Sequence, residues 1–154
     1  MADLALIYTD EEGWGALSDE ERLVREQASQ LVDAEVVPVI EAHAQAQTFP
    51  RQLVRRMGDL GFYGPTLPAR YGCAGASSVA AGLLMYELER GDSAIRSFAS
   101  VQGSLVMWPI HEYGSEAQKD RWLPRLARGE VVGCFGLTEP DAGSNPAGMR
   151  TRAV

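Results

Sequence analysis

Apolar residues recur at three- and four-residue steps over residues 18–46, the spacing that keeps side chains on one face of an α-helix. Ser18 precedes three acidic residues, and a hydroxyl followed by carboxylates favours a helix start. Pro38 lacks a backbone donor and crowds the preceding turn, so we expect a kink or break near Val37. The apolar face comprises Val24, Ala28, Leu31, Val32, Val36, Val39 and Ile40.

Four further helices are predicted from the same periodicity and from start and stop signals in the sequence. Hydroxyl or carboxylate residues stand at three of the expected starts, and a glycine stands at or beside each expected end. The Gly- and Pro-rich stretch 61–76 predicts a long loop. The expected helices run from Pro50 to Gly61, from Ser77 or Ser78 to Gly91, from Asp92 or Ser93 to Tyr113–Gly114, and from Ser115 to Gly129.

A short run of β-branched and aromatic residues at 131–137 predicts a single strand after the helices. The fold class is therefore expected to be mainly α. A strand without a partner leaves its N–H and C=O groups unpaired, so the chain is interpreted as incomplete. Cys134 within this strand is expected to be a small buried hydrophobe, and Cys73 and Cys134 are both expected to be free thiols.

Composition excludes several classes of function. The chain has 154 residues, which suits one domain, and a net charge of −7, which offers no basic surface for nucleic acid. No apolar run approaches the roughly 20 residues of a membrane span, and the N-terminus resembles neither a signal nor a transit peptide. A soluble, cytoplasmic protein is expected. His43 and His111 have no second ligand at metal-binding spacing, so no metal site is predicted.

The polar segment after the predicted strand could contact a ligand. Gly143 and Ser144 would let the main chain approach a phosphate or a planar ring, and Thr138 adds a hydroxyl that donates and accepts. From the residues alone, an ordinary strand followed by a turn explains the segment equally well.

Arg96 is the second candidate. It falls in the first turn of a predicted helix, where the helix dipole disfavours a cation unless a negative group faces it. That group could be a bound carboxylate, which an arginine grips in a bidentate way, or the side chain of Glu89 or Asp92. Both interpretations remain open from the residues.

Two motifs carry a resemblance to a known family. FGLTEPDAGSN, residues 135–145, resembles the signature of the acyl-CoA dehydrogenases, and ELERGDSAIRS, residues 87–97, is similar to the pattern of their glutaryl-CoA dehydrogenase branch. The resemblance covers about residues 20–154. It implies an N-terminal extension at 1–17, the family's N-terminal helical domain at 18–129, and the start of its middle β domain at 130–154.

The resemblance also implies roles for individual residues. Arg96 and Ser97 would bind the distal carboxylate of the substrate, with Glu89 helping to place it. The catalytic base of the family is a glutamate of its C-terminal helical domain, so no catalytic residue is expected in this sequence. FAD would be contacted by Phe135, Gly136, Leu137, Thr138, Gly143 and Ser144, and Ser144 would also reach the substrate.

The function implied is the FAD-dependent oxidative decarboxylation of glutaryl-CoA to crotonyl-CoA, with an electron-transfer flavoprotein as acceptor and a homotetramer at full length. The present chain is expected to be inactive alone. Two alternatives stay open: a dehydrogenase for another short-chain acyl-CoA, in which Arg96 is only structural, and a non-catalytic helical interaction subunit. The sequence does not distinguish a natural truncation, a split-gene subunit and a partial sequence.

Overall fold

Helices form nearly all the regular structure of this computed structural model, which describes residues 17–152. This confirms the mainly α fold class. Residues 1–16 of the expected N-terminal extension lie outside the described residues. The α-helices are α2 (Asp19–Leu31), α3 (Val37–Gln45), α4 (Gln52–Asp59), α5 (Ser78–Gly91), α6 (Ser93–Ser100), α7 (Trp108–Tyr113) and α8 (Glu116–Ala127), joined by π-helical η1 (Val32–Val36) and η3 (Val101–Met107) and 3₁₀ turns η2 (Ala69–Tyr71) and η4 (Pro146–Gly148).

The helix starts follow the predicted capping residues. Ser18 and Ser115 each form a reciprocal capping box with the residue three positions later. Ser77, not Ser78, caps α5, and the carboxylate of Asp92 accepts two backbone N–H bonds at the start of α6. These caps satisfy N–H groups that the first turn of a helix leaves without partners.

Both long helices contain a π-helical stretch directly before a proline. The first rod is α2–η1–α3, with Pro38 in the first turn of α3, and the second is α6–η3–α7, with Pro109 in the first turn of α7. A proline cannot donate to the carbonyl four residues earlier, and its ring collides with that carbonyl in a regular α-helix. The wider π turn relieves this collision. Before Pro38, where a kink or break was expected, the helix therefore widens into a π turn without a break, and the similar stretch before Pro109 was not predicted.

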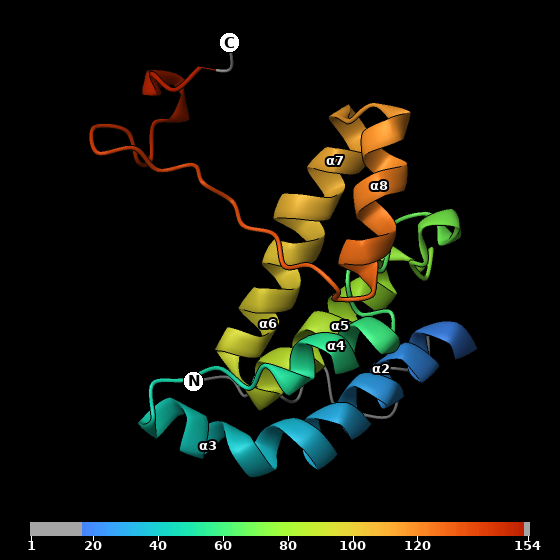
Figure 1. Ribbon diagram of the computed structural model, residues 1–154. Coiled ribbons are helices and arrows are strands. Elements are labelled where there is room, and N and C mark those ends of the chain that lie inside the picture. The colour runs from blue at the N-terminus through green and yellow to red at the C-terminus, as the bar shows by residue number, and fades with distance from the viewer. Residues whose placement is uncertain (1–16, 153–154) are drawn as a thin grey trace.

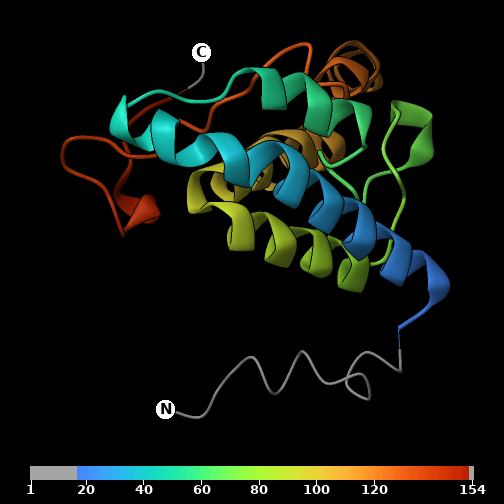
Figure 2. The same cartoon turned by 90° about the horizontal axis from the view of Figure 1, so that it is seen from below.

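Helices α2 and α5 lie side by side along their length (Figure 2). Their direction is parallel, since Ser77 bonds Glu21 at one end and Arg90 pairs with Asp33 at the other. Between these ends, the buried carboxylate of Glu87 pairs with Arg25 at 3.0 Å and with Arg90 at 2.8 Å. Two cations thus neutralise a carboxylate that lies almost wholly out of water.

Helices α7 and α8 form a hairpin that projects from the rest of the helical body (Figure 1), and α8 also contacts η2 and η3. The C-terminal end of α8 meets α4 at backbone distance: a Cβ on Gly58 would lie 2.4 Å from the backbone carbonyl of Arg128. Only glycine allows this approach. The core among these helices includes the fully buried side chains Leu53, Met57, Tyr63, Leu84, Leu88, Ile95, Met107 and Leu123.

After α8 the chain leaves the helical body as an extended segment (Figure 1). The strand predicted at 131–137 is not formed in the described residues, where the only β pairing is an isolated bridge between Glu139 and Ala142. A strand needs a neighbouring strand for its hydrogen bonds, and the described residues supply none. The expected burial of Cys134 is wrong for the same reason: its thiol is exposed, whereas that of Cys73 is buried. Both thiols are free, as predicted.

Candidate functional site

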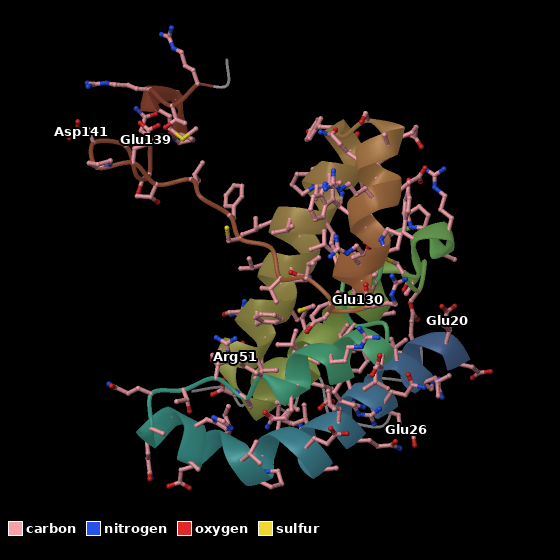
Figure 3. The ribbon with its side chains drawn as sticks, in the orientation of Figure 1. Glu20, Glu26, Arg51, Glu130, Glu139 and Asp141 are labelled. Carbon is pink, nitrogen blue, oxygen red and sulfur yellow. The ribbon has the colours of Figure 1, made fainter. Side chains whose placement is uncertain are left out.

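The segment that resembles a flavin signature lies apart from the helices. Its side chains of Phe135, Thr138 and Ser144 are exposed, and Figure 3 shows Glu139 and Asp141 on the same projecting part of the chain. The backbone at Gly136 and at Gly143 has no heavy atom near the place of a Cβ. Main-chain groups here are open to a ligand.

Glu139 gives this segment a local structure. Its backbone exchanges two hydrogen bonds with Ala142, and its carboxylate accepts bonds from the N–H groups of Arg150 at 2.8 Å and Thr151 at 2.7 Å. Bonds from Thr151 and then from the Arg150 amide lower the pKa of the Glu139 carboxyl below its ordinary value. The turn that carries Gly143 and Ser144 is thereby closed by a charged carboxylate.

This donor set suits a flavin nucleotide. A ring edge or a phosphate can accept hydrogen bonds from the hydroxyls of Thr138 and Ser144 and from backbone N–H groups of this segment. The absence of side chains at Gly136 and Gly143 allows close approach of a planar ring. The residues therefore fit FAD chemically, and the side chains of Thr138 and Ser144 are exposed to a ligand.

Arg96 lies on α6 beside Glu89 of α5. Its Nε donates to Oε2 of Glu89 at 2.7 Å, and the hydroxyl of Ser93 donates to Oε1 of the same carboxylate at 2.7 Å. Bonds from Arg96 and then from Ser93 lower the pKa of the Glu89 carboxyl. Asp92 is occupied as the helix cap, so of the two acidic partners considered for Arg96 the structure selects Glu89.

The Arg96 guanidinium has N–H donors that Glu89 does not use. Its side chain is 36% exposed, and among the described residues only Glu89 receives a hydrogen bond from it, through Nε. The two terminal nitrogens, which form the fork that grips a carboxylate, are not used in that contact. Ser97 follows on the same helix, partly buried.

The structure does not bring the two candidate groups into one cavity. Arg96 belongs to the continuous rod α6–η3–α7, and the 131–145 segment packs against Val106 of the same rod through Gly133, ten residues further along. At about 1.5 Å per residue this is roughly 15 Å along the rod. No hydrogen bond or ion pair joins Arg96, Ser97 or Glu89 to residues 135–145 in the described part of the chain.

Two apolar grooves lie elsewhere on the helical body. One, of about 480 Å³, is formed by α7, α8 and residues 131–133, and the other, of about 450 Å³, lies between the 64–67 loop, α5 and η3. None of the site residues predicted from sequence lines either groove.

Metal and membrane interpretations find no support among the described residues. Within 17–152 no three His, Cys, Asp or Glu side chains come together as ligands. His43 contacts the Thr48 hydroxyl at 2.8 Å, and the His111 ring packs edge-on against Tyr71. No helix in that range has both the length and the apolar composition needed to cross a bilayer.

Sequence reasoning missed Gln102. This residue of η3 is 1% exposed, and its side-chain amide bonds to three backbone groups where α8 gives way to the extended segment. One amide inside an apolar run carries no distinctive sequence signal, because a surface glutamine is far commoner.

Comparison with known proteins identifies the fold. Residues 18–130 match the family model described as acyl-CoA dehydrogenase, N-terminal domain. An acyl-CoA dehydrogenase of Bacillus subtilis is 35% identical over 138 residues, which are 90% of this chain and 36% of that protein. Glutaryl-CoA dehydrogenase of Desulfococcus multivorans is 36% identical over 140 residues, 89% of this chain and 36% of that protein.

The similarity extends to crystal structures. Glutaryl-CoA dehydrogenase of Mycobacterium smegmatis is 53% identical, with a TM-score of 0.85 over 89% of this chain and 35% of that chain. A glutaryl-CoA dehydrogenase of M. smegmatis in complex with FADH2 has a TM-score of 0.84 at 53% identity, over 88% of this chain and 35% of that chain. The present chain thus spans about 36% of the length of the curated relatives it matches. Because the family model covers most of its residues, the chain belongs to the acyl-CoA dehydrogenase family, in which it corresponds to the N-terminal helical domain.

Proposed function

We propose that this chain is the N-terminal part of an FAD-dependent glutaryl-CoA dehydrogenase, which oxidises and decarboxylates glutaryl-CoA to crotonyl-CoA. The observation that carries the proposal is Arg96, a partly exposed guanidinium oriented through Nε by Glu89, with its terminal nitrogens left for a ligand. The 53% identity to the M. smegmatis glutaryl-CoA dehydrogenase supports the same substrate. In this proposal residues 18–129 form the helical domain and 130–154 begin the β domain.

Arg96 would act on the end of the acyl chain far from the thioester. The terminal N–H groups of its guanidinium grip the distal carboxylate in a bidentate contact, and the hydroxyl of Ser97 supplies a further donor. Glu89 fixes the orientation of the fork and offsets part of its charge. A monocarboxylic acyl-CoA of similar length, such as butyryl-CoA, has no group for this contact.

The extended segment would hold the cofactor. Phe135, Gly136, Leu137 and Thr138 contact the flavin, while Gly143 and Ser144 offer backbone and hydroxyl donors to its phosphates and, from Ser144, to the thioester. FAD, when bound, supplies the acceptor for a hydride from the substrate. An electron-transfer flavoprotein would accept the electrons, and the full-length protein would be a homotetramer.

No residue of this chain is assigned as the catalytic base, so the chain alone is proposed to be inactive. The direct check is an assay of the isolated chain with glutaryl-CoA, FAD and an artificial electron acceptor. Robust turnover would show that the base lies within these 154 residues.

The substrate is tested by Arg96→Gln in the polypeptide that also carries the downstream domains. Losing two charge-assisted hydrogen bonds of about 1.5–3 kcal/mol each lowers kcat/KM for glutaryl-CoA by roughly a hundredfold or more, at about 1.4 kcal/mol per factor of ten. The value for butyryl-CoA stays nearly unchanged. Equal losses with both substrates would instead support the alternative of a general short-chain dehydrogenase.

Arg56→Gln provides the matched control. Arg56 on α4 also donates Nε to a carboxylate, that of Glu35, at 2.7 Å, and its side chain is similarly exposed. The two substitutions therefore remove the same charge and the same kind of ion pair. Only Arg96→Gln should change the ratio of kcat/KM for glutaryl-CoA to kcat/KM for butyryl-CoA.

A further inference from the structure

The side-chain amide of Gln102 makes all its hydrogen bonds at the junction between α8 and the extended segment. Its Nε2 donates to the carbonyl of Leu126 at 3.1 Å and to that of Val131 at 2.9 Å, while its Oε1 accepts from the N–H of Gly133 at 3.0 Å. All three partners are backbone groups at the end of α8 or in the first residues beyond it. Both amide hydrogens and the oxygen of this buried side chain are thus hydrogen-bonded, although Val131 and Gly133 are themselves only partly buried.

The same junction contains a close contact that a side chain in place of Gly133 would disturb. A Cβ on Gly133 would lie 2.4 Å from one methyl of Val106 and 2.8 Å from the other. The backbone of the departing segment therefore rests directly on η3, one turn beyond Gln102. Gly129, at a φ of +66°, ends α8 and turns the chain toward this contact.

We propose that Gln102 is a positioning residue: with Leu126, Val131 and Gly133 it forms a clamp that fixes where, and in which direction, the 131–145 segment leaves the helical domain. Because Gln102 and Arg96 belong to one continuous rod, the clamp holds the segment at a set distance from Arg96. The interpretation of this distance as the separation between the flavin contacts and the carboxylate contacts rests on the proposed function. The clamp itself is independent of the proposed function.

The competing explanation is that Gln102 only fills the core. The buried face of η3 also carries Met107, and an amide with three bonds stabilises any structure it joins. The two explanations differ in what a variant changes. Loss of packing lowers stability throughout the helices. Loss of the clamp instead frees residues 131–138 to move, while the stability of the helices is unchanged.

The test measures position and local opening in the full 154-residue chain, without flavin or acyl-CoA. Spin labels are attached to Cys134, whose thiol is exposed, and to a cysteine placed by Val79→Cys at an exposed position of α5. Cys73 stays unlabelled because it is buried. The clamp predicts one narrow distance distribution, which Gln102→Met converts to a broad one. Amide exchange at Gly133 accelerates about tenfold, as expected when its hydrogen bond to Gln102 is lost.

Two further variants make the outcome decisive. Leu88→Ala removes a fully buried side chain of α5 and lowers stability without touching the clamp, so its distance distribution should remain narrow. Gly133→Ala pushes the segment off Val106 from outside the helical core and should broaden the distribution even if Gln102→Met fails to fold.

A narrow distribution in folded Gln102→Met, or in Gly133→Ala, would overturn the proposal. Since neither measurement involves a ligand, a failed glutaryl-CoA assay would leave the clamp standing, and a failed clamp would leave the substrate proposal standing.

Discussion

Two glycine-to-alanine substitutions in helices should change stability in opposite directions. Gly82 lies within α5 and has no heavy atom near the place of a Cβ, so Gly82→Ala should stabilise the chain by about 0.5–1 kcal/mol through helix propensity alone. Gly58 lies within α4, where the new Cβ would meet the Arg128 carbonyl carbon and oxygen, both at 2.4 Å.

The magnitude for Gly58→Ala follows from that contact. The atoms in the way are backbone, which cannot turn aside as a side chain can, so we take the upper end of the usual overpacking cost, about 2–3 kcal/mol. Subtracting the propensity gain of about 1 kcal/mol leaves a net loss of about 1–2 kcal/mol. The two variants therefore differ by about 1.5–3 kcal/mol in the free energy of unfolding, although the chemical change is identical.

Urea unfolding followed by far-ultraviolet circular dichroism measures both free energies. The slope of the unfolding free energy against urea concentration is expected to be the same in both variants. At roughly 2–4 °C per kcal/mol, thermal midpoints should separate by roughly 3–12 °C. Stabilisation by both substitutions would refute the close approach of α4 and α8 on which the reasoning depends.

Three other predictions concern buried groups. Glu87→Gln should lower the free energy of unfolding by about 1–3 kcal/mol, because two arginines lose their buried anion; urea titration against wild type checks this, and an unchanged midpoint contradicts it. A thiol reagent should modify Cys134 at once and Cys73 only after urea is added; rapid reaction of two thiols in the native chain would contradict the burial of Cys73. Burial raises the pKa of the Cys73 thiol from 9.0 to about 11, so the unfolded chain loses this proton first and stability falls as pH rises between those values. Urea midpoints across that range should decline less steeply in Cys73→Ala; parallel declines would exclude this thiol as the cause.

Local signals predicted most of the helical domain. The caps at Ser18, Ser77, Asp92 and Ser115 are short-range chemistry, since a side-chain oxygen and the N–H groups of the next turn are all it needs. Helix ends at glycine are equally local, as Gly129 illustrates. Such features can be inferred because the competing conformations are few.

Features that depend on distant partners could not be inferred in the same way. Cys134 was expected to be buried because its neighbours are apolar, but burial requires other strands that the described residues do not contain. The roles of Gly58 and Gln102 arise from backbone brought close by tertiary packing, over about 70 residues for Gly58 and over 24 to 31 for Gln102. The Arg96–Glu89 pair was one of two options in the sequence, and the helix cap at Asp92 decided it.

The π-helical segments give the two rods an unusual tolerance in length. Each additional residue in a helix advances every later side chain by about 100°, which normally forbids insertions and deletions there. Where a turn has already widened ahead of Pro38 or Pro109, one residue can be lost if the proline is lost with it, and the helix returns to regular winding. Relatives without these prolines should therefore align with a one-residue gap inside a helix, not in a loop, and helical-wheel diagrams drawn across η3 will assign α7 to the wrong face.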